Sequence, residues 1–129
     1  MTDESIRDRA REAYELGRAA LAAGDIEGAI AHMETSIGEY PHFKALEALG
    51  EAWLRKGEPL RAIVPLAAAT TLSRQVRAPS LLAEALLAIG DELEAHRAAQ
   101  IALDRDATDK KAREVLEATR AAHEAWNKL

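Results

Sequence analysis

The chain has 129 residues, a formal net charge of −5 and no cysteine. This length fits one folded domain, and the lack of cysteine excludes disulfides, thiolate zinc sites and cysteine nucleophiles. The negative charge and the aromatic content of 4% argue against nucleic acid as a partner, because nucleic acid requires a basic surface and stacking side chains.

The beginning of the chain is charged and lacks the apolar core of a signal peptide. The longest apolar stretch, residues 62–72, is interrupted by Pro65 and is far shorter than the roughly 20 residues that cross a bilayer. We therefore expect no membrane insertion and a cytoplasmic location.

Apolar residues recur at spacings of three and four along most of the chain, which predicts amphipathic helices. In chain order the predicted helices span residues 3–23, 26–39, 42–56, 59–73, 77–89, 92–105 and 108–127. An all-α fold is therefore expected.

Three glycines divide this helical pattern at equal intervals. Gly24, Gly57 and Gly90 are each 33 residues apart, and an acid follows each of them. Glycine ends a helix readily because it accepts a left-handed backbone, and the acid can cap the helix that follows. Other columns repeat in the same register: Gly17, Gly50 and Ala83; Ala29, Ala62 and Ala95; and Leu21, Leu54 and Leu87. Each repeat is therefore a helix-turn-helix hairpin whose apolar face must pack against a neighbour.

The segments from Leu16 to Pro41 and from Leu49 to Ile63 resemble the tetratricopeptide repeat, with a Leu-small pair, a mid-repeat glycine and an alanine in the second helix. The third repeat fits less closely, because His96 and Ala99 replace bulkier apolar residues. The resemblance implies a right-handed α-solenoid of three helical hairpins in a single domain, residues 1–129. The repeats would span about 10–41, 43–74 and 76–107, followed by a capping helix at 108–127. Ankyrin repeats share the period, but their Thr-Pro-Leu-His signature is absent.

If the hairpins stack as this resemblance implies, the first helix of each hairpin lines a concave groove. The helical period turns several columns of residues away from the core. The ligand-groove candidates from these columns are Arg11, Tyr14, Arg18, Lys44, Glu47, Glu51, Leu54, Arg77, Glu84, Leu87 and Lys110.

The basic column of Arg11, Lys44, Arg77 and Lys110 is the sharpest functional hint. Most of its members lie near predicted helix N-termini, where positive charge is mildly unfavourable, so a use such as pairing with an acidic ligand would explain it. The alternative is solubility, or ion pairs with acids that end the preceding hairpins, such as Glu39 and Asp106. For the leucine column, the alternatives are an apolar groove floor or packing between neighbouring first helices.

Some members of this family grip a partner's C-terminal carboxylate with lysine, asparagine and arginine side chains. The corresponding residues here look like Tyr14, Arg18, Ala48, Arg77 and Leu81. Only Arg77 matches that pattern, so we do not predict binding of chaperone C-termini.

The histidines form no recognised catalytic arrangement. Glu92 and His96 are four residues apart, which can place two metal ligands on one helix face. Two ligands without a third are more typical of a solvated surface pair, and His123 is expected on the outer side of the capping helix. We therefore expect no enzyme activity, no cofactor and no metal.

The sequence thus predicts a protein–protein interaction module, an adaptor, scaffold or chaperone-like protein that binds an acidic peptide or protein segment in its groove. Three-repeat members of the family include bacterial secretion and assembly chaperones, so a bacterial-like role is an expectation. The alternative is a self-associating structural protein that uses an exposed hairpin end. We expect a monomer or a weak homodimer.

Overall fold

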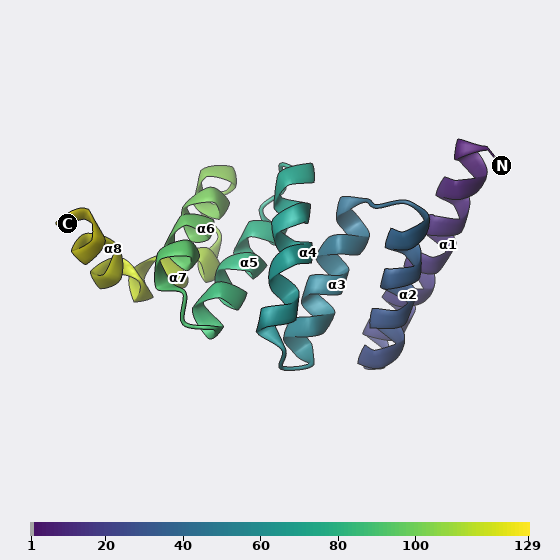
Figure 1. Ribbon diagram of the computed structural model, residues 1–129, viewed down its shortest axis with the longest axis horizontal. Coiled ribbons are helices and arrows are strands. Elements are labelled where there is room, and N and C mark those ends of the chain that lie inside the picture. Colours follow the sequence, from purple (N-terminus) through teal and green to yellow (C-terminus); the bar gives the residue numbers. More distant parts are fainter. Residues whose placement is uncertain (1) are drawn as a thin grey trace.

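The computed structural model describes residues 2–129, and Met1, the first residue of the predicted domain, lies outside this range. Within the described residues the chain forms eight helices and no strand (Figure 1). They are α1 (Asp3–Ala22), α2 (Ile26–Glu39), α3 (Phe43–Arg55), α4 (Pro59–Leu72), α5 (Arg77–Ala88), α6 (Glu92–Arg105), α7 (Lys110–Ala118) and α8 (Arg120–Asn127). The first six agree with the predicted helices to within one residue at each end.

The helices pair in chain order into three hairpins, α1 with α2, α3 with α4 and α5 with α6, and these pairs have the most extensive contacts. The second helix of each hairpin packs against the first helix of the next, and α1, α3, α5 and α7 also contact one another in turn. Figure 1 shows the hairpins side by side along the long axis of the molecule. The prediction of an all-α solenoid of stacked hairpins is confirmed.

Each hairpin turns at one of the three spaced glycines, which are the positive-φ residues of the described chain, at φ 81°, 84° and 86°. Around Gly24, the Gly24 amide donates to the Leu21 carbonyl at 3.1 Å and the Asp25 amide donates to the Ala20 carbonyl at 2.8 Å. The same two bonds recur at the other glycines, which is the Schellman arrangement. Asp25 then caps α2 by accepting from the Gly28 amide at 2.9 Å.

Small residues on the first helices let the hairpins close tightly. A Cβ added at Gly17 would lie 2.8 Å from Cε of Met33, and one added at Gly50 would overlap the Leu66 side chain. Met33 and Leu66 are fully buried and occupy equivalent positions of α2 and α4. The large side chain of the second helix therefore fills the space that the glycine leaves on the first.

The prediction of one continuous capping helix over 108–127 is wrong, because α7 and α8 are separated at Thr119. The Thr119 hydroxyl is fully buried and donates back to the Val115 carbonyl at 2.8 Å, a bond that bends helices. After this break α8 runs off from α7 at the C-terminal end of the molecule (Figure 1). No residue of α8 is buried.

His96 and His123 also lie elsewhere than expected. His96 is buried, with 5% of its surface exposed, and its Nδ1 lies 2.8 Å from the Thr119 hydroxyl oxygen. The His123 ring stacks on it, with centroids 4.0 Å apart and an interplanar angle of 13°. The prediction of a solvated His96 is therefore wrong. His96 of α6 contacts Thr119, where α7 and α8 are separated, and His123 of α8.

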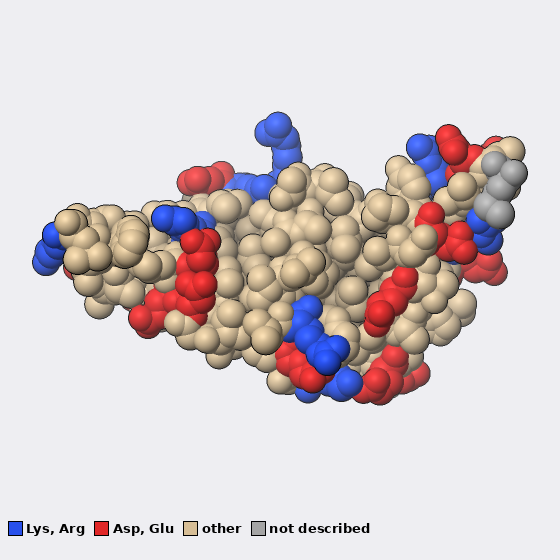
Figure 2. Space-filling view, viewed as in Figure 1, with Lys and Arg blue, Asp and Glu red and all other residues tan. Residues whose placement is uncertain are grey.

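Charged side chains are sparse over α4 in the middle of the face shown in Figure 2. Leu60, Val64 and Leu72 are exposed on this helix. No helix within residues 2–129 combines the length and the apolar character that crossing a bilayer demands.

Candidate functional site

The candidate site is a groove formed where α1, α3, α5 and α7 contact one another. Two adjoining hollows, of about 470 and 310 Å³, share Glu51, Arg55 and Arg77 as lining residues. The remaining lining residues are Arg18, Leu21 and Ala22 in the first hollow and Leu54, Leu81, Glu84 and Lys111 in the second. We call these two hollows together the central groove.

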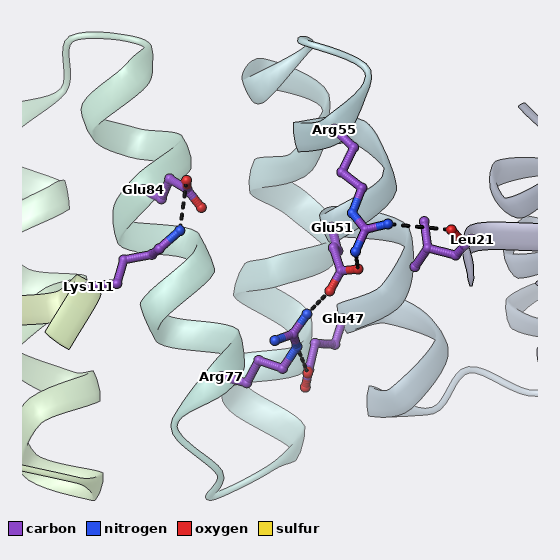
Figure 3. A network of polar contacts seen from close by, with 7 residues as sticks. All are labelled: Leu21, Glu47, Glu51, Arg55, Arg77, Glu84 and Lys111. Atoms are coloured by element: carbon purple, nitrogen blue, oxygen red, sulfur yellow. Dashed lines mark hydrogen bonds and ion pairs between the residues drawn. The ribbon is translucent and has the colours of Figure 1, made fainter. Parts of the chain in front are cut away.

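A network of ion pairs crosses the middle of the central groove (Figure 3). Arg77 of α5 reaches back to α3, where its Nε lies 3.0 Å from Oε1 of Glu47 and its Nη2 pairs with Glu51. The other oxygen of Glu51 lies 2.9 Å from Nη2 of Arg55, one helical turn further along α3. Nη1 of Arg55 donates to the Leu21 carbonyl of α1 at 3.4 Å. The network therefore ties together the first helices of all three hairpins.

The two acids of this network are largely buried, and the two arginines lie at the mouth of the groove. The Glu47 and Glu51 side chains are 14% and 12% exposed, whereas those of Arg77 and Arg55 are 54% and 50% exposed. Burial raises the pKa of Glu47, while the nearby Arg77 and Arg18 guanidinium groups oppose that rise. The positive ends of the network thus face solvent, and a guanidinium has five N–H donors, more than these contacts use.

Further along the groove, α7 contributes a second ion pair. Nζ of Lys111 lies 3.0 Å from Oε1 of Glu84 on α5, and both side chains are partly exposed (Figure 3). Leu54 and Leu81 are half-buried residues of this hollow. The groove therefore combines aliphatic side chains with cations held by acids.

A separate hollow of about 260 Å³ lies beside the N-terminal half of α1 and the first turn of α3, and we call it the end hollow. Its lining residues are Arg7, Arg11, Tyr14, Glu15, Tyr40, His42 and Lys44. It is displaced from the central groove along both helices, because Arg18 and Arg55 lie further toward their C-termini.

The structure distributes the predicted ligand-groove residues over these two places. Arg18, Glu51, Leu54, Arg77 and Glu84 line the central groove, and Glu47 adjoins it through Arg77. Arg11, Tyr14 and Lys44 line the end hollow. In the leucine column, Leu21 is buried and Leu54 and Leu87 pack against the core, so the packing alternative holds, while Leu54 also lines the groove.

The basic column does not act as one row. Arg77 is engaged by Glu47 and Glu51, and Arg11 lies 3.6 Å from Asp8 of its own helix. On α7 it is Lys111 that reaches Glu84, while Lys110 is exposed beside it.

The acids expected to pair with this column have other partners. Glu39 pairs with Arg9 at 3.0 Å, and Asp106 accepts hydrogen bonds from the amide and hydroxyl of Thr108. Those hydrogen bonds lower the pKa of Asp106.

Sequence reasoning missed Arg55 and Lys111 in the central groove and Arg7, Tyr40 and His42 in the end hollow. Arg55 had a signal, because it follows Glu51 by four residues on a helix. Arg7 had a similar signal, because it precedes Arg11 by four residues on the same helix. Lys111, Tyr40 and His42 depend on how the links between helices bend, which the repeat period does not report.

The candidate metal ligands do not gather. In the part of the chain that the structure describes, no group of three or more His, Asp or Glu side chains is placed to hold a metal ion. Glu92 is exposed at the start of α6, while His96 is turned inward against Thr119.

No protein-family model and no curated protein matches the sequence. Solved structures do match. The first tetratricopeptide-repeat domain of Spaghetti (RPAP3), bound to an HSP90 peptide, superposes with a TM-score of 0.84 at 19% identity, over 90% of this chain and 94% of that one. The tetratricopeptide-repeat domain of a putative FK506-binding protein from Plasmodium falciparum gives 0.84 at 16% identity, over 100% and 97%.

A third structure is the Yersinia enterocolitica type III secretion chaperone SycD in complex with a peptide of the translocator YopD. It gives a TM-score of 0.73 at 21% identity, over 92% of each chain. At these identities the likeness establishes architecture, and the chain therefore has the tetratricopeptide-repeat fold.

Proposed function

We propose that this protein is a non-catalytic interaction module, an adaptor, scaffold or chaperone-like protein, whose central groove binds a segment of another protein. The observation that carries this proposal is the groove itself, where leucine side chains lie beside guanidinium groups held at the mouth by buried acids. Such a surface suits an extended or helical segment that carries aliphatic anchors and acidic flanks.

Two of the similar structures support this use of the fold. The Spaghetti domain is bound to an HSP90 peptide, and the Yersinia chaperone is in complex with a translocator peptide. The groove of this chain has its own chemistry, because Tyr14, Ala48 and Leu81 stand where a carboxylate-gripping member has lysine, asparagine and arginine. The proposed ligand is therefore an internal acidic and aliphatic segment.

Each part of the groove has a defined role in this proposal. The half-buried Leu54 and Leu81 contact the aliphatic anchors, whose burial supplies most of the affinity. Arg18 acts on Glu47 through its charge but forms no ion pair within the described residues, so its guanidinium can contact an acid of the ligand. Exposed cations of this kind add attraction and specificity that weaken as salt is raised.

The proposal is tested by selecting peptides from a random phage-displayed library on the immobilised protein. We expect the selected peptides to be rich in aliphatic residues and in Asp or Glu. Their binding should weaken about tenfold in the Arg18→Glu variant, because one charge reversal in a partly desolvated groove is worth on the order of 1.4 kcal/mol.

A matched control is Lys128→Glu, which reverses an exposed charge outside the groove. Arg77→Glu is unsuitable, because it would place a third carboxylate against Glu47 and Glu51. If no peptides are enriched, or if the enriched peptides bind Arg18→Glu as tightly as Lys128→Glu, the groove is not the binding surface.

Self-association is the alternative, and sedimentation velocity separates the two. For an interaction module that acts as a monomer we expect one sedimentation coefficient across the micromolar range. A coefficient that rises with concentration would favour the alternative. We also propose a cytoplasmic location.

A further inference from the structure

The end hollow has walls that belong to three parts of the chain. Arg7, Arg11 and Tyr14 come from α1, Tyr40 and His42 from the link between α2 and α3, and Lys44 from the first turn of α3. The hollow therefore exists only because the first hairpin is docked on the second.

Hydrogen bonds fix the position of its His42 wall. The buried Ser36 hydroxyl donates to the Ala10 carbonyl at 2.6 Å, and its oxygen lies 3.0 Å from Nε2 of His42. Because a hydroxyl has one proton, His42 must donate through Nε2 for both contacts to be hydrogen bonds. The Tyr14 ring meets His42 edge-on, with centroids 5.5 Å apart. The aromatic walls are thus held before any ligand arrives.

The charges of the end hollow are predominantly positive. Arg7, Arg11 and Lys44 face a single lining acid, Glu15. Lys44 has no ion pair within the described residues, and the Arg11–Asp8 pair is long and exposed, with 72% and 63% of the side chains in solvent. Burial, and then the nearby Lys44, lower the pKa of His42, so His42 is neutral at pH 7 and adds no charge.

The aromatic groups add to the anion-binding character of this hollow. The Arg7 guanidinium carbon lies 5.5 Å from the centroid of the Tyr40 ring, which orients this arginine through a cation–π contact. The first turn of α3 contains no acid, so the positive end of the helix dipole adds to the Lys44 charge.

We infer that the end hollow binds a carboxylate side chain of the segment held in the central groove. The acid lies among Lys44, Arg11 and Arg7, and its methylene groups contact the rings of Tyr14 and Tyr40. This inference rests on the proposed function and adds a fixed anchoring point to it.

The position of the end hollow sets a spacing for the ligand. Arg11 and Arg18 are seven residues apart on α1, a distance of about 10 Å at 1.5 Å per residue. An extended segment covers this distance in about three residues. The ligand therefore carries an Asp or Glu about three residues from the aliphatic or acidic group that occupies the central groove.

The test uses three simple probes on the full chain labelled with nitrogen-15. These are the peptide acetyl-Glu-Glu-Glu-Glu-amide, its glutamine counterpart and inorganic phosphate. We expect the glutamate peptide to shift the amide resonances of Tyr14, His42 and Lys44, with a response that falls as salt is raised. The glutamine peptide should shift them much less.

The Lys44→Glu variant should weaken this binding about tenfold, while Lys128→Glu should leave it unchanged. Both lysines are exposed, so neither change disturbs the core. Equal responses to the two peptides, or an unchanged response in Lys44→Glu, would overturn the inference. Shifts confined to Arg18, Arg55 and Arg77 would overturn it too, while leaving the proposed function intact. Binding of phosphate without binding of the glutamate peptide would also overturn it.

Discussion

At the scale of single residues, the repeat is shaped by matched volumes between its two helices. Gly17 faces Met33 and Gly50 faces Leu66, whereas the equivalent positions of the third repeat, Ala83 and Ala99, are both alanine and both fully buried. A larger residue on the first helix thus accompanies a smaller one on the second. This explains why Ala99 departs from the bulky apolar pattern without loosening the core.

Gly50→Ala should destabilise the protein by about 1–3 kcal/mol, because the added methyl overlaps the Leu66 side chain in a close-packed core. Gly17→Ala should cost less, since the Met33 side chain that it meets is flexible. Gly38→Ala is the matched control, as nothing lies within 4 Å of its added Cβ, and it should stabilise by about 0.4–1 kcal/mol. Urea unfolding measures all three, and equal effects at Gly50 and Gly38 would contradict this packing.

The His96 environment makes stability depend on pH. Burial, followed by the neighbouring His123 and Arg120, lowers the pKa of His96. The Thr119 hydroxyl donates to Val115, so the Thr119 oxygen accepts from Nδ1–H of a neutral His96.

Protonation of His96 should therefore destabilise the folded state. The pKa of His96 is below 6.5 in the folded state, so on acidification the unfolded chain binds the proton first. The contribution of neutral His96 to the free energy of unfolding is therefore full above pH 6.5 and is lost as the pH falls through the folded-state pKa. We expect the free energy of unfolding to decrease from pH 7 to pH 5, and to decrease less in His96→Gln, which does not titrate. Parallel pH profiles for the two proteins would show that His96 plays no part.

At the scale of elements, hairpin contacts are fixed by ion pairs as well as by apolar packing. Arg77 at the start of α5 neutralises two acids of α3 that are largely buried. Removing Arg77 would leave the desolvated carboxylates without this partner, which lowers the free energy of unfolding more than the loss of an exposed ion pair does.

Arg77→Gln should lower the free energy of unfolding by about 1–2 kcal/mol, a value discounted because Arg77 is half exposed. It should also raise the pKa of Glu47, since burial then acts with less opposition. Carbon-13 NMR titration of the glutamate carboxyl groups measures the second effect. The control is Arg97→Gln, which breaks an exposed pair with Glu94 and should change stability by less than about 0.5 kcal/mol.

The helix boundaries within each hairpin could be predicted closely, because the spaced glycines adopt the left-handed backbone that ends a helix. The break at Thr119 could not, because threonine within a helix is common and bends it only when its hydroxyl is bonded back and held from outside. In this chain the outside partner is His96, whose inward orientation depends on tertiary packing.

At the scale of the whole molecule, stacking brings residues 33 positions apart onto one surface, and that surface is the groove. The repeat period alone could therefore identify Arg18, Glu51 and Glu84 as neighbours. It could not show that Glu51 is nearly buried or that Arg77 is engaged by acids, because both depend on how far α5 approaches α3. The end hollow depends on the path of the link between α2 and α3, which the repeat period does not specify.

We propose that the ligand binds on the surface formed by α1, α3, α5 and α7. The most direct measurement is an NMR titration of the labelled protein with a peptide selected from the random library. We expect the perturbed amides to lie on these helices and on the link before α3, including those of Arg18, Glu51 and Arg77. Perturbations confined to α2, α4 and α6 would contradict it.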